Sequence, residues 1–296
     1  MLHPAGQVDS LRITTLVDDY VGHQPHFYAE HGISFLVEVT TGKKKKNILF
    51  DTGQSGLPLL HNMKHLGIDP TSIDAIFLSH CHYDHTGGVV EALTAIGKNN
   101  LPVIGHPAIF RDNYVFDPFI RNIGFTKNNG ITALEDSGGQ PLLIKEPFEI
   151  MPGVLSTGEV PRRVDFEQQS IVNYNLADGV LVLDKREDDL SIVINVKDAG
   201  LVVLVGCSHA GIINIINHAR DITGIEKVEA VMGGLHLISA ADEKISRTAR
   251  TLQEMDIAAV IAGHCTGFKA CAELERVLKN RFQLLHCGKV LTVPKG

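Results

Sequence analysis

Residues 78–88 read Leu-Ser-His-Cys-His-Tyr-Asp-His-Thr-Gly-Gly, and they hold four potential metal ligands: His80, His82, Asp84 and His85. The apolar run that precedes them is typical of a buried parallel strand. Side chains two positions apart on an extended segment point the same way, so His80 and His82 are predicted to bind one cation. Asp84 and His85 fall in the following turn and are predicted to face a second cation. The alternative, a set of hydrogen-bonded polar residues in a surface turn, explains so dense a cluster less well.

Three later histidines each follow a strand-like apolar run and a glycine. They are His209, His236 and His264. Sites in open α/β sheets form beyond the carboxyl ends of strands, and a glycine there lets the backbone turn tightly. We therefore expect these imidazoles to converge on the first cluster, although each one alone is more typical of a capping or packing residue.

The remaining histidines lack this context and are interpreted as surface or local hydrogen-bonding groups. His23 and His26 are the exceptions, because their loop, residues 20–31, can fold over the site. Asp51 ends another strand-like run, and two interpretations of it stay open. It is either a partner that fixes the tautomer of a ligand histidine or the first residue of an Asx-type turn.

The composition excludes several classes of protein. The chain has 296 residues, 44% hydrophobic and 21% charged, and its net charge of −7 gives no global attraction to nucleic acid or anionic membrane. No apolar stretch approaches the roughly 20 residues that cross a bilayer, and no secretory signal opens the chain. Cys81, Cys207 and Cys265 flank histidines, which suits reduced thiols better than disulfides. We predict a cytoplasmic protein that acts on a small molecule without nucleic-acid or membrane partners, and a homo-oligomer stays open.

Apolar runs alternate with helical patterns after residue 50, which predicts mixed sheets covered by helices. Strands are predicted over residues 11–17, 33–40, 47–51, 74–79, 102–105, 180–184, 190–197, 200–206, 227–232 and 258–263. Helices are predicted over residues 54–66, 87–97, 210–222, 241–255 and 268–280. The basic run Lys43–Lys46 is interpreted as a solvated hairpin loop. Residues 108–145 and 158–178 fit neither pattern and are predicted to be lids or binding loops, with a disordered insertion as the alternative.

The motifs together resemble the metallo-β-lactamase fold superfamily. The resemblance rests on Phe-Asp-Thr-Gly at residues 50–53, on the His-x-His-x-Asp-His element and on Gly263-His264, and it spans about residues 11–293. The stretches around His209, His236 and His264 further resemble a microbial branch described as metal-dependent hydrolases. Some members of that branch are described as a pterin-transferring synthase of the methanopterin pathway.

The resemblance implies an α/β fold, an αββα sandwich of two mixed sheets flanked by helices. It implies one such domain over residues 1–296, with inserted loops near 108–145 and 158–178, and a site for two divalent metal ions between the sheet edges. Zinc is the first choice, with iron or manganese as alternatives, because histidine and carboxylate ligands accept all three.

The sequence departs from the family pattern in two places. The usual mid-chain histidine is replaced near Glu159, and the usual metal-bridging aspartate aligns with Cys207. The implied ligands are therefore His80, His82 and His209 for one metal, and Asp84, His85 and His264 for the other. Glu159 and Cys207 are either ligands or supporting residues, like Asp51. His236 is a ligand, a substrate contact or a proton donor.

Three functions follow as hypotheses. The first is a hydrolase that uses a dinuclear metal-bound hydroxide on a small, anionic ester or phosphoester, with Asp84 orienting the nucleophile and His236 protonating the leaving group. Arg162 and Arg163 are either contacts for the substrate anion or a solvated pair. The second is a metal-dependent transferase that condenses a dihydropterin-methyl pyrophosphate with a ribofuranosylaminobenzene phosphate. The third is a non-catalytic metal or redox sensor, suggested by the cysteines beside the ligands.

Overall fold

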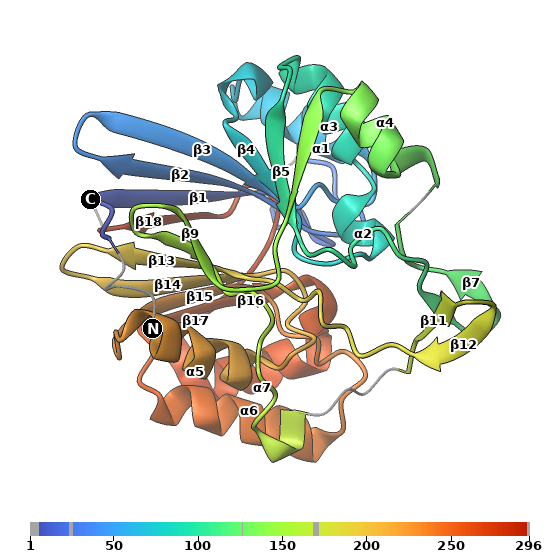
Figure 1. Cartoon of the computed structure of the whole chain (residues 1–296). Coiled ribbons are helices and arrows are strands. Elements are labelled where there is room, and N and C mark those ends of the chain that lie inside the picture. The colour runs from blue at the N-terminus through green and yellow to red at the C-terminus, as the bar shows by residue number, and fades with distance from the viewer. Residues whose placement is uncertain (1–5, 24–25, 126, 168–171, 295–296) are drawn as a thin grey trace.

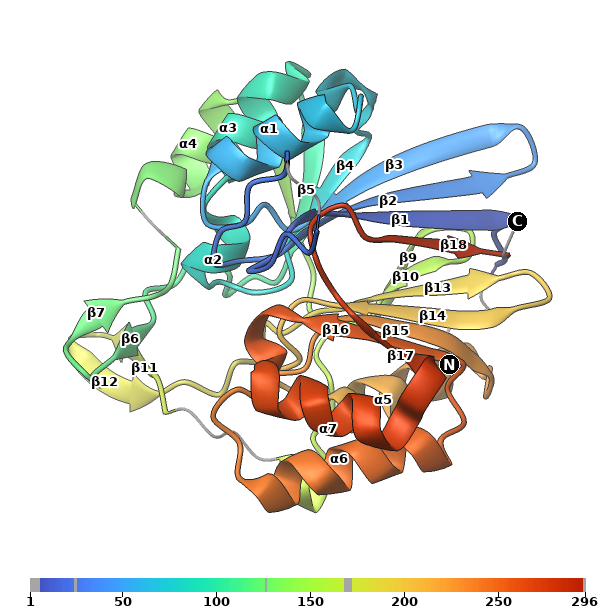
Figure 2. The same cartoon turned by 180° about the vertical axis from the view of Figure 1, so that it is seen from behind.

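Two seven-stranded β-sheets lie face to face, and helices cover the outer face of each in the computed structural model (Figure 1). The structure describes residues 6–23, 26–125, 127–167 and 172–294. The view from behind shows the same order of layers (Figure 2). This is the αββα sandwich of two mixed sheets that the resemblance implied.

The first sheet is built mainly from the N-terminal part of the chain. Its strands, in spatial order, are β18 (Val290–Val293), β1 (Ser10–Val17), β2 (Ser34–Thr41), β3 (Lys44–Phe50), β4 (Ala75–Phe77), β5 (Leu101–Gly105) and β8 (Gly139–Leu143). Neighbours are antiparallel from β18 to β3 and parallel from β3 to β8. The helices on its outer face are α1 (Gly56–His65), α3 (Val89–Ile96) and α4 (Ile131–Asp136).

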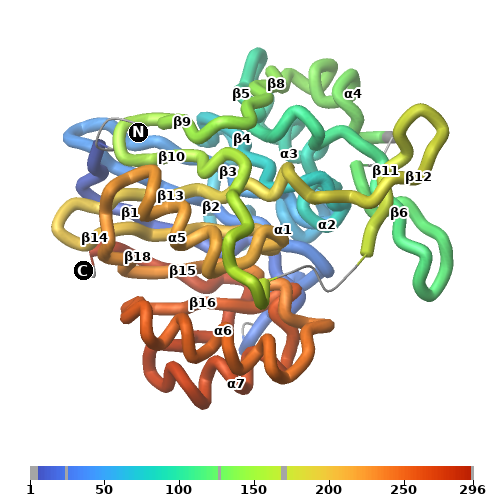
Figure 3. The backbone as a smooth tube through the Cα atoms, turned by 60° about the horizontal axis from the view of Figure 1, so that its bottom comes forward, coloured from blue at the N-terminus to red at the C-terminus, as the bar shows by residue number. Residues whose placement is uncertain are grey.

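The second sheet has the same plan. Its strands, in spatial order, are β17 (Phe282–Leu284), β16 (Ala259–Gly263), β15 (Val228–Gly234), β14 (Gly200–Val205), β13 (Ile192–Val196), β10 (Val154–Ser156) and β9 (Phe148–Met151). Neighbours are parallel from β17 to β14 and antiparallel from β14 to β9. The helices that cover it are α5 (Ile212–Thr223), α6 (Asp242–Glu254) and α7 (Phe268–Leu278) (Figure 3).

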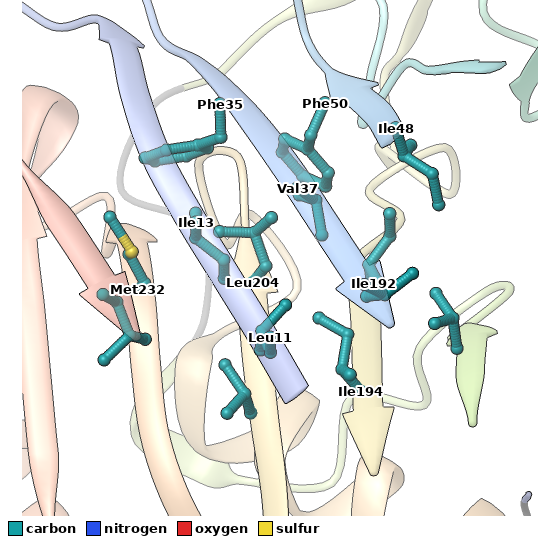
Figure 4. Close-up of a cluster of buried hydrophobic side chains, with 14 of the residues drawn as sticks. Leu11, Ile13, Phe35, Val37, Ile48, Phe50, Ile192, Ile194, Leu204 and Met232 are labelled. Atoms are coloured by element: carbon teal, nitrogen blue, oxygen red, sulfur yellow. The ribbon is translucent and has the colours of Figure 1, made fainter. Parts of the chain in front are cut away.

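The main core lies between the two sheets. Ile13 and Phe35 of the first sheet face Ile192 and Leu204 of the second (Figure 4). Alternate residues of the same strands, such as Leu49, pack against the helices on the outside. Because both faces of these strands are covered over much of their length, most of them contain a run of consecutive apolar residues, and these runs made the strands recognisable.

Each predicted strand and helix has a counterpart in the structure, with ends shifted by a few residues. The prediction for the lysine run is wrong, because Lys44, Lys45 and Lys46 belong to β3 and the turn holds only Gly42 and Lys43. Gly42 adopts a φ of 59°, which a tight hairpin turn requires. Lys45 Nζ lies 2.6 Å from Glu38 Oε1 on the neighbouring strand, so these lysines suit an exposed strand end. Among the described residues, no helix combines the length and hydropathy needed to cross a bilayer.

A small third sheet projects from one side of the sandwich (Figures 1 and 3). We call it the accessory sheet, and its strands in spatial order are β12 (Val180–Leu183), β11 (Tyr174–Ala177), β6 (Tyr114–Val115) and β7 (Arg121–Asn122). It is formed largely by the two segments, 108–145 and 158–178, that the sequence left unassigned. Of these segments, residues 126 and 168–171 lie outside the described residues.

Candidate metal centre

The two sheets bring three of the predicted ligands together. His80 Nε2 lies 3.1 Å from His82 Nδ1 and 3.2 Å from His209 Nε2. His80 and His82 lie in the loop after β4, whereas His209 follows β14 in the other sheet. All three side chains are buried. The sandwich thus assembles the first predicted ligand group from distant parts of the chain.

A second group lies beside the first. Asp84 Oδ2, on the short helix α2 (Tyr83–Thr86), lies 3.6 Å from His85 Nε2 and 3.3 Å from His264 Nε2. Cys207 Sγ lies 3.1 Å from His85 Nε2, and the ligand atoms of these four residues all lie within 4.8 Å of one another. The rings of His80 and His85 are 4.1 Å apart between centroids. The structure therefore also gathers the second predicted group and adds Cys207 to it.

Asp51 and Ser79 support these imidazoles from behind. Asp51 Oδ2 accepts hydrogen bonds of 2.7 Å from both His85 Nδ1 and Ser79 Oγ. Since the Ser79 hydroxyl donates to Asp51, its oxygen accepts from His80 Nδ1, at 2.9 Å. A proton on Nδ1 leaves the Nε2 lone pair of His80 and His85 directed at the other ligands. Asp51 thus has the geometry of a tautomer-fixing partner, one of the two interpretations left open by the sequence.

Asp19 plays the same part for His264. Asp19 Oδ1 accepts a hydrogen bond of 2.7 Å from His264 Nδ1. Its other oxygen, Oδ2, lies 3.0 Å from His31 Nδ1, and His31 Nε2 lies 3.4 Å from Asp84 Oδ2. Sequence reasoning missed both Asp19 and His31, which join the early loop to the candidate metal centre.

The early loop, residues 20–31, does reach the site, but it does so through His31 and not through His26, which was singled out from the sequence. The ring of His26 packs against His65 on α1, with centroids 5.1 Å apart. His31 is the histidine of this loop that approaches the ligands. A sequence pattern for Asp19 existed, because it closely follows the carboxyl end of β1, as Asp51 directly follows that of β3.

The ionisation of most predicted ligands suits metal binding, and His264 is the exception. Burial lowers its pKa, but Cys265 and the carboxylates of Asp19 and Asp84 outweigh burial and raise the pKa of His264 well above the usual histidine value, so a metal bound there must displace a proton. Burial and the neighbouring histidines hold the pKa of His80 and of His209 well below the usual histidine value. Burial lowers the pKa of His82 to about 3. Burial opposes ionisation of Asp84, but the adjacent imidazoles outweigh it and lower the pKa of that carboxyl well below its usual value. Neutral imidazoles and an ionised carboxylate are the forms that bind divalent metals.

The distances also fit a metal ion. Nitrogens bound about 2.0–2.1 Å from a tetrahedral zinc ion lie roughly 3.3–3.4 Å apart. The separations of 3.1 and 3.2 Å around His80 Nε2 are close to this. His82, however, belongs to none of the groups of described residues whose ligand atoms all lie within 4.8 Å of one another, whereas His80 and His209 form such a group with Cys207. Both ring nitrogens of His236, which also borders the site, lack a hydrogen-bond partner within the described part of the chain. One contact opposes ligation: Arg186 Nη1 lies 3.1 Å from His209 Nδ1, and this contact must break for His209 to bind a metal through Nε2.

Strained backbone marks the strand ends that form the site. Four residues that are not glycine have φ values of 47–59° there: Asp51, Ser208, His236 and His264. They follow β3, β14, β15 and β16, respectively. Such conformations cost about 1–3 kcal/mol each and concentrate at functional sites, where the surrounding structure maintains them.

The glycines that precede His209, His236 and His264 were predicted to allow tight turns, and Gly206 does not have this role. Gly206 has no positive φ, so its role is close approach rather than a tight turn. A Cβ at position 206 would lie 2.3 Å from Ser79 Oγ and 3.1 Å from Asp51 Oδ2. The space above Gly206 is therefore needed by the residues that orient His80 and His85.

Glu159 is not brought to the metal centre. Its Oε1 lies 2.9 Å from His106 Nε2 and 3.4 Å from Lys145 Nζ. It belongs to no group of potential ligands found among the described residues. The mid-chain position of the family pattern is thus occupied here by an ion pair at the edge of the sandwich.

A pocket of about 680 Å³ lies over the two ligand groups. His82, Asp84 and His236 contribute to its inner surface, and the accessory sheet contributes Arg121 and Tyr174. The ring of Phe116, also in the pocket wall, meets the ring of Tyr174 edge-on at 5.3 Å between centroids. The pocket thus combines an apolar wall with a cation, opposite the candidate metal ligands.

Buried ion pairs tie the accessory sheet to the metal-binding loop. Arg111 Nη2 lies 3.0 Å from Asp184 Oδ2, and Arg111 Nη1 lies 2.6 Å from Asp188 Oδ2. Asp184 directly follows β12, and Asp188 Oδ2 accepts a hydrogen bond of 2.8 Å from the backbone N–H of Cys81. Cys81 stands between His80 and His82, so this network fixes the pocket wall relative to the ligands.

Known proteins similar to this chain include a metal-dependent hydrolase, which agrees with the grouping of potential metal ligands. A family profile described as the metallo-beta-lactamase superfamily matches residues 30–162. A 7,8-dihydropterin-6-methyl-4-(beta-D-ribofuranosyl)-aminobenzene-5'-phosphate synthase of Methanocaldococcus jannaschii is 40% identical over 294 residues, which is 98% of this chain and 99% of the relative. The crystal structure of Tm1679, described as a metal-dependent hydrolase of the beta-lactamase superfamily, has a TM-score of 0.79 and 27% identity, and the match covers 95% of this chain and 98% of that one. The chain therefore belongs to the metallo-beta-lactamase superfamily.

Proposed function

We propose that the protein is a metal-dependent hydrolase of small, anionic esters or phosphoesters. The observation that carries this proposal is the pair of adjacent ligand groups beneath one pocket, with His80 Nε2 lying 3.1 Å from a ring nitrogen of His82 and 3.2 Å from one of His209. The similarity to Tm1679, a protein described as a metal-dependent hydrolase, supports the same reaction class.

Each residue has a proposed role. His80, His82 and His209 hold one divalent ion, and Asp84, His85 and His264 hold the other; zinc is preferred, and iron or manganese is compatible. Ions bound there would lower the pKa of a bound water and polarise an oxygen of the substrate. Asp84 orients the attacking water through its carboxylate. His236, which borders the pocket and has two unpartnered ring nitrogens within the described residues, delivers a proton from one of them to the leaving group.

The pocket favours an anionic substrate with a flat apolar part. Arg121 and Arg186 line it, and guanidinium groups suit phosphate and carboxylate. Phe116 and Tyr174 offer aromatic surface beside them. Neither Arg162 nor Arg163, the pair noted in the sequence, lines this pocket among the described residues. Arg121→Gln should raise KM for anionic substrates much more than it changes kcat, because Arg121 lies in the wall of the pocket.

A second candidate is group transfer, favoured by the name of the 40% identical relative, a pterin-ribofuranosylaminobenzene-phosphate synthase. In this reaction a dihydropterin-methyl group leaves its pyrophosphate and couples to the aromatic acceptor, with the metals stabilising the pyrophosphate. The same ligands serve both reactions. The sensor alternative has less support, because the relative named here is an enzyme.

The experiment that tests the proposal begins with elemental analysis of protein purified without chelator. The same protein is assayed with a panel of phosphoesters and lactones, and with a dihydropterin-methyl pyrophosphate in the presence and absence of the aromatic acceptor. Free pterin alcohol indicates hydrolysis, whereas a coupled product indicates transfer. Absence of bound metal after exposure to zinc, iron(II) and manganese would refute both.

His82→Ala tests the ligand assignment. Metal content and activity should fall together while the circular dichroism spectrum is kept. The matched control is His61→Ala, because His61 is a half-buried histidine on α1 whose ring stacks on Tyr28 and whose Nε2 contacts His26 O at 2.8 Å, away from the predicted ligands. Full metal occupancy in His82→Ala would contradict the assignment.

A further inference from the structure

Cys207 belongs to three of the four groups of potential ligands found among the described residues, and the fourth consists of Asp19, His31 and His264. Its Sγ is within 4.8 Å of the ligand atoms of Asp84, His85 and His264, which form one group, and of His80 and His209 in another. It also belongs to a third group with His236 and Cys265. No other residue in the described ranges belongs both to the group of Asp84, His85 and His264 and to the group of His80 and His209.

The backbone holds this thiol in place. Cys207 follows β14 directly after Gly206, and its side chain is buried. Its neighbour Ser208 adopts a φ of 59°, and the Ser208 hydroxyl donates a 2.7 Å hydrogen bond to Gly234 O at the end of β15. On the other side of the thiol, Gly206 O accepts a 2.9 Å hydrogen bond from the Gly234 N–H. The strand end is therefore anchored on both sides of the thiol, which lies 3.1 Å from His85 Nε2.

The other cysteines have different surroundings. Cys265 Sγ accepts a hydrogen bond from the His236 backbone N–H at 3.3 Å and faces Cys207 O at 3.7 Å, and it belongs only to the third group. Cys81 is buried in the metal-binding loop and belongs to no ligand group of the described residues. Cys271 and Cys287 face the carbonyl oxygens of other residues. Only Cys207 is positioned between the two proposed metals.

We infer that Cys207 binds as a thiolate shared by both metal ions, in the position between the two ligand groups. This inference rests on the proposed function. Binding breaks the S–H bond, releases that proton to solvent and forms sulfur–metal bonds, so the site gains one negative charge without a change in redox state. A thiolate has enough lone pairs for two cations, and it is a soft donor.

The shared thiolate predicts the metal preference of the centre. Soft sulfur ligands favour zinc and iron over the hard, oxygen-preferring ions magnesium and calcium. The replacement of the family's bridging carboxylate by sulfur should therefore make the second metal position more selective, with manganese bound least well of the three transition metals proposed above.

The test uses cobalt(II) as the probe, because a thiolate bound to cobalt(II) gives a charge-transfer band in the near ultraviolet that imidazole and carboxylate ligands do not give. The cobalt-loaded parent protein should show this band, and Cys207→Ser should lose it. Cobalt affinity in Cys207→Ser should fall by at least the roughly 10–100-fold that loss of a ligand-supporting group costs. Cys81→Ala and Cys265→Ser are the matched controls and should keep the band.

The outcomes separate this inference from the proposed function. A parent protein that binds no metal refutes the proposed function, and the inference with it. A parent that binds metal while Cys207→Ser keeps the band, or while Cys265→Ser loses it, overturns the inference and leaves the metalloenzyme proposal intact.

X-ray absorption on the zinc-loaded parent needs no variant, so a folding defect in Cys207→Ser does not prevent the test. A sulfur shell at about 2.3 Å from zinc is expected, and a shell of nitrogen and oxygen alone overturns the inference.

Discussion

Replacing Asp51 with asparagine measures how much the hydrogen bonds that orient the ligand histidines contribute to metal affinity. Three donors surround the Asp51 carboxylate, each at 2.7 Å: the Ser79 N–H to Oδ1, and the Ser79 hydroxyl and His85 Nδ1 to Oδ2. An asparagine places its NH₂ group against at least one of these donors in either orientation. The substitution therefore loses at least one charge-assisted hydrogen bond without a change in side-chain volume.

The size of the effect follows from these contacts. A hydrogen bond to a charged group contributes about 1.5–3 kcal/mol. Loss of a partner that orients a metal ligand typically weakens metal binding by about 10–100-fold, which corresponds to roughly 1.4–2.7 kcal/mol. Since both values describe the same contacts with His85 and Ser79, Asp51→Asn should weaken zinc binding by about 10–100-fold.

The assay is a competition titration of zinc against a chromophoric chelator, with the free energy of unfolding of the metal-free protein measured by urea denaturation. Asp74→Asn is the control, because the Asp74 carboxylate also accepts a side-chain and a backbone hydrogen bond but lies at the protein surface near Lys46. Zinc affinity in Asp51→Asn equal to that of the control would refute the reasoning that Asp51 fixes the ligand tautomers.

Three further predictions concern packing, pH and the buried ion pairs. Gly206→Ala should cost about 1–3 kcal/mol of unfolding free energy and lower zinc affinity, because its Cβ would lie 2.3 Å from Ser79 Oγ. Gly105→Ala is the control and should be nearly neutral in the same urea and zinc titrations, because its Cβ would meet the end of the Ile109 side chain at 3.2 Å and Leu78 O at an ordinary contact distance of 3.7 Å. Burial raises the pKa of Asp189 to about 7, whereas the same carboxyl in the unfolded chain loses its proton near pH 4. Between these two pH values only the folded state holds the proton. The free energy of unfolding should therefore fall as the pH rises from about 4 to about 7. Asp189→Asn should therefore be more stable than the parent at pH 8 and similar to it below pH 4, and equal pH dependence of urea unfolding in the two proteins would contradict this. Arg111→Met removes the cation that pairs with two buried carboxylates, Asp184 and Asp188, and should cost about 3–5 kcal/mol in thermal or urea unfolding. A cost below about 1 kcal/mol would show that their remaining hydrogen bonds and water stabilise them without Arg111.

Two kinds of candidate ligand were predicted from the sequence: those that lie close together along the chain, and those that closely follow an apolar strand. His80, His82, Asp84 and His85 are within one turn and one short helix, so their proximity needs no tertiary information. His209 and His264 were predicted because each follows a buried strand, and the carboxyl ends of such strands form one rim of a sheet.

Other features of the site were not predicted from the sequence, although Asp19 closely follows the carboxyl end of β1. Asp19 and His31 approach His264 and Asp84 only because the early loop lies across the rim. Glu159 stands in the sequence where the family has a histidine, yet its carboxylate pairs with His106 at the edge of the sandwich. The accessory sheet joins short strands from both unassigned segments, and strands of two to four residues leave almost no periodicity to read.

The layered α/β fold and the identity of most candidate ligands can be predicted from the order of the amino acids, because both depend on short-range patterns: hydrophobic periodicity and the spacing of coordinating side chains. Which atoms face one another depends instead on tertiary packing. The packing of two sheets sets the distance between His80 and His209 and the place of the Cys207 sulfur between the two groups, since contacts across 129 and 122 positions depend on how the strands stack and not on their order along the chain.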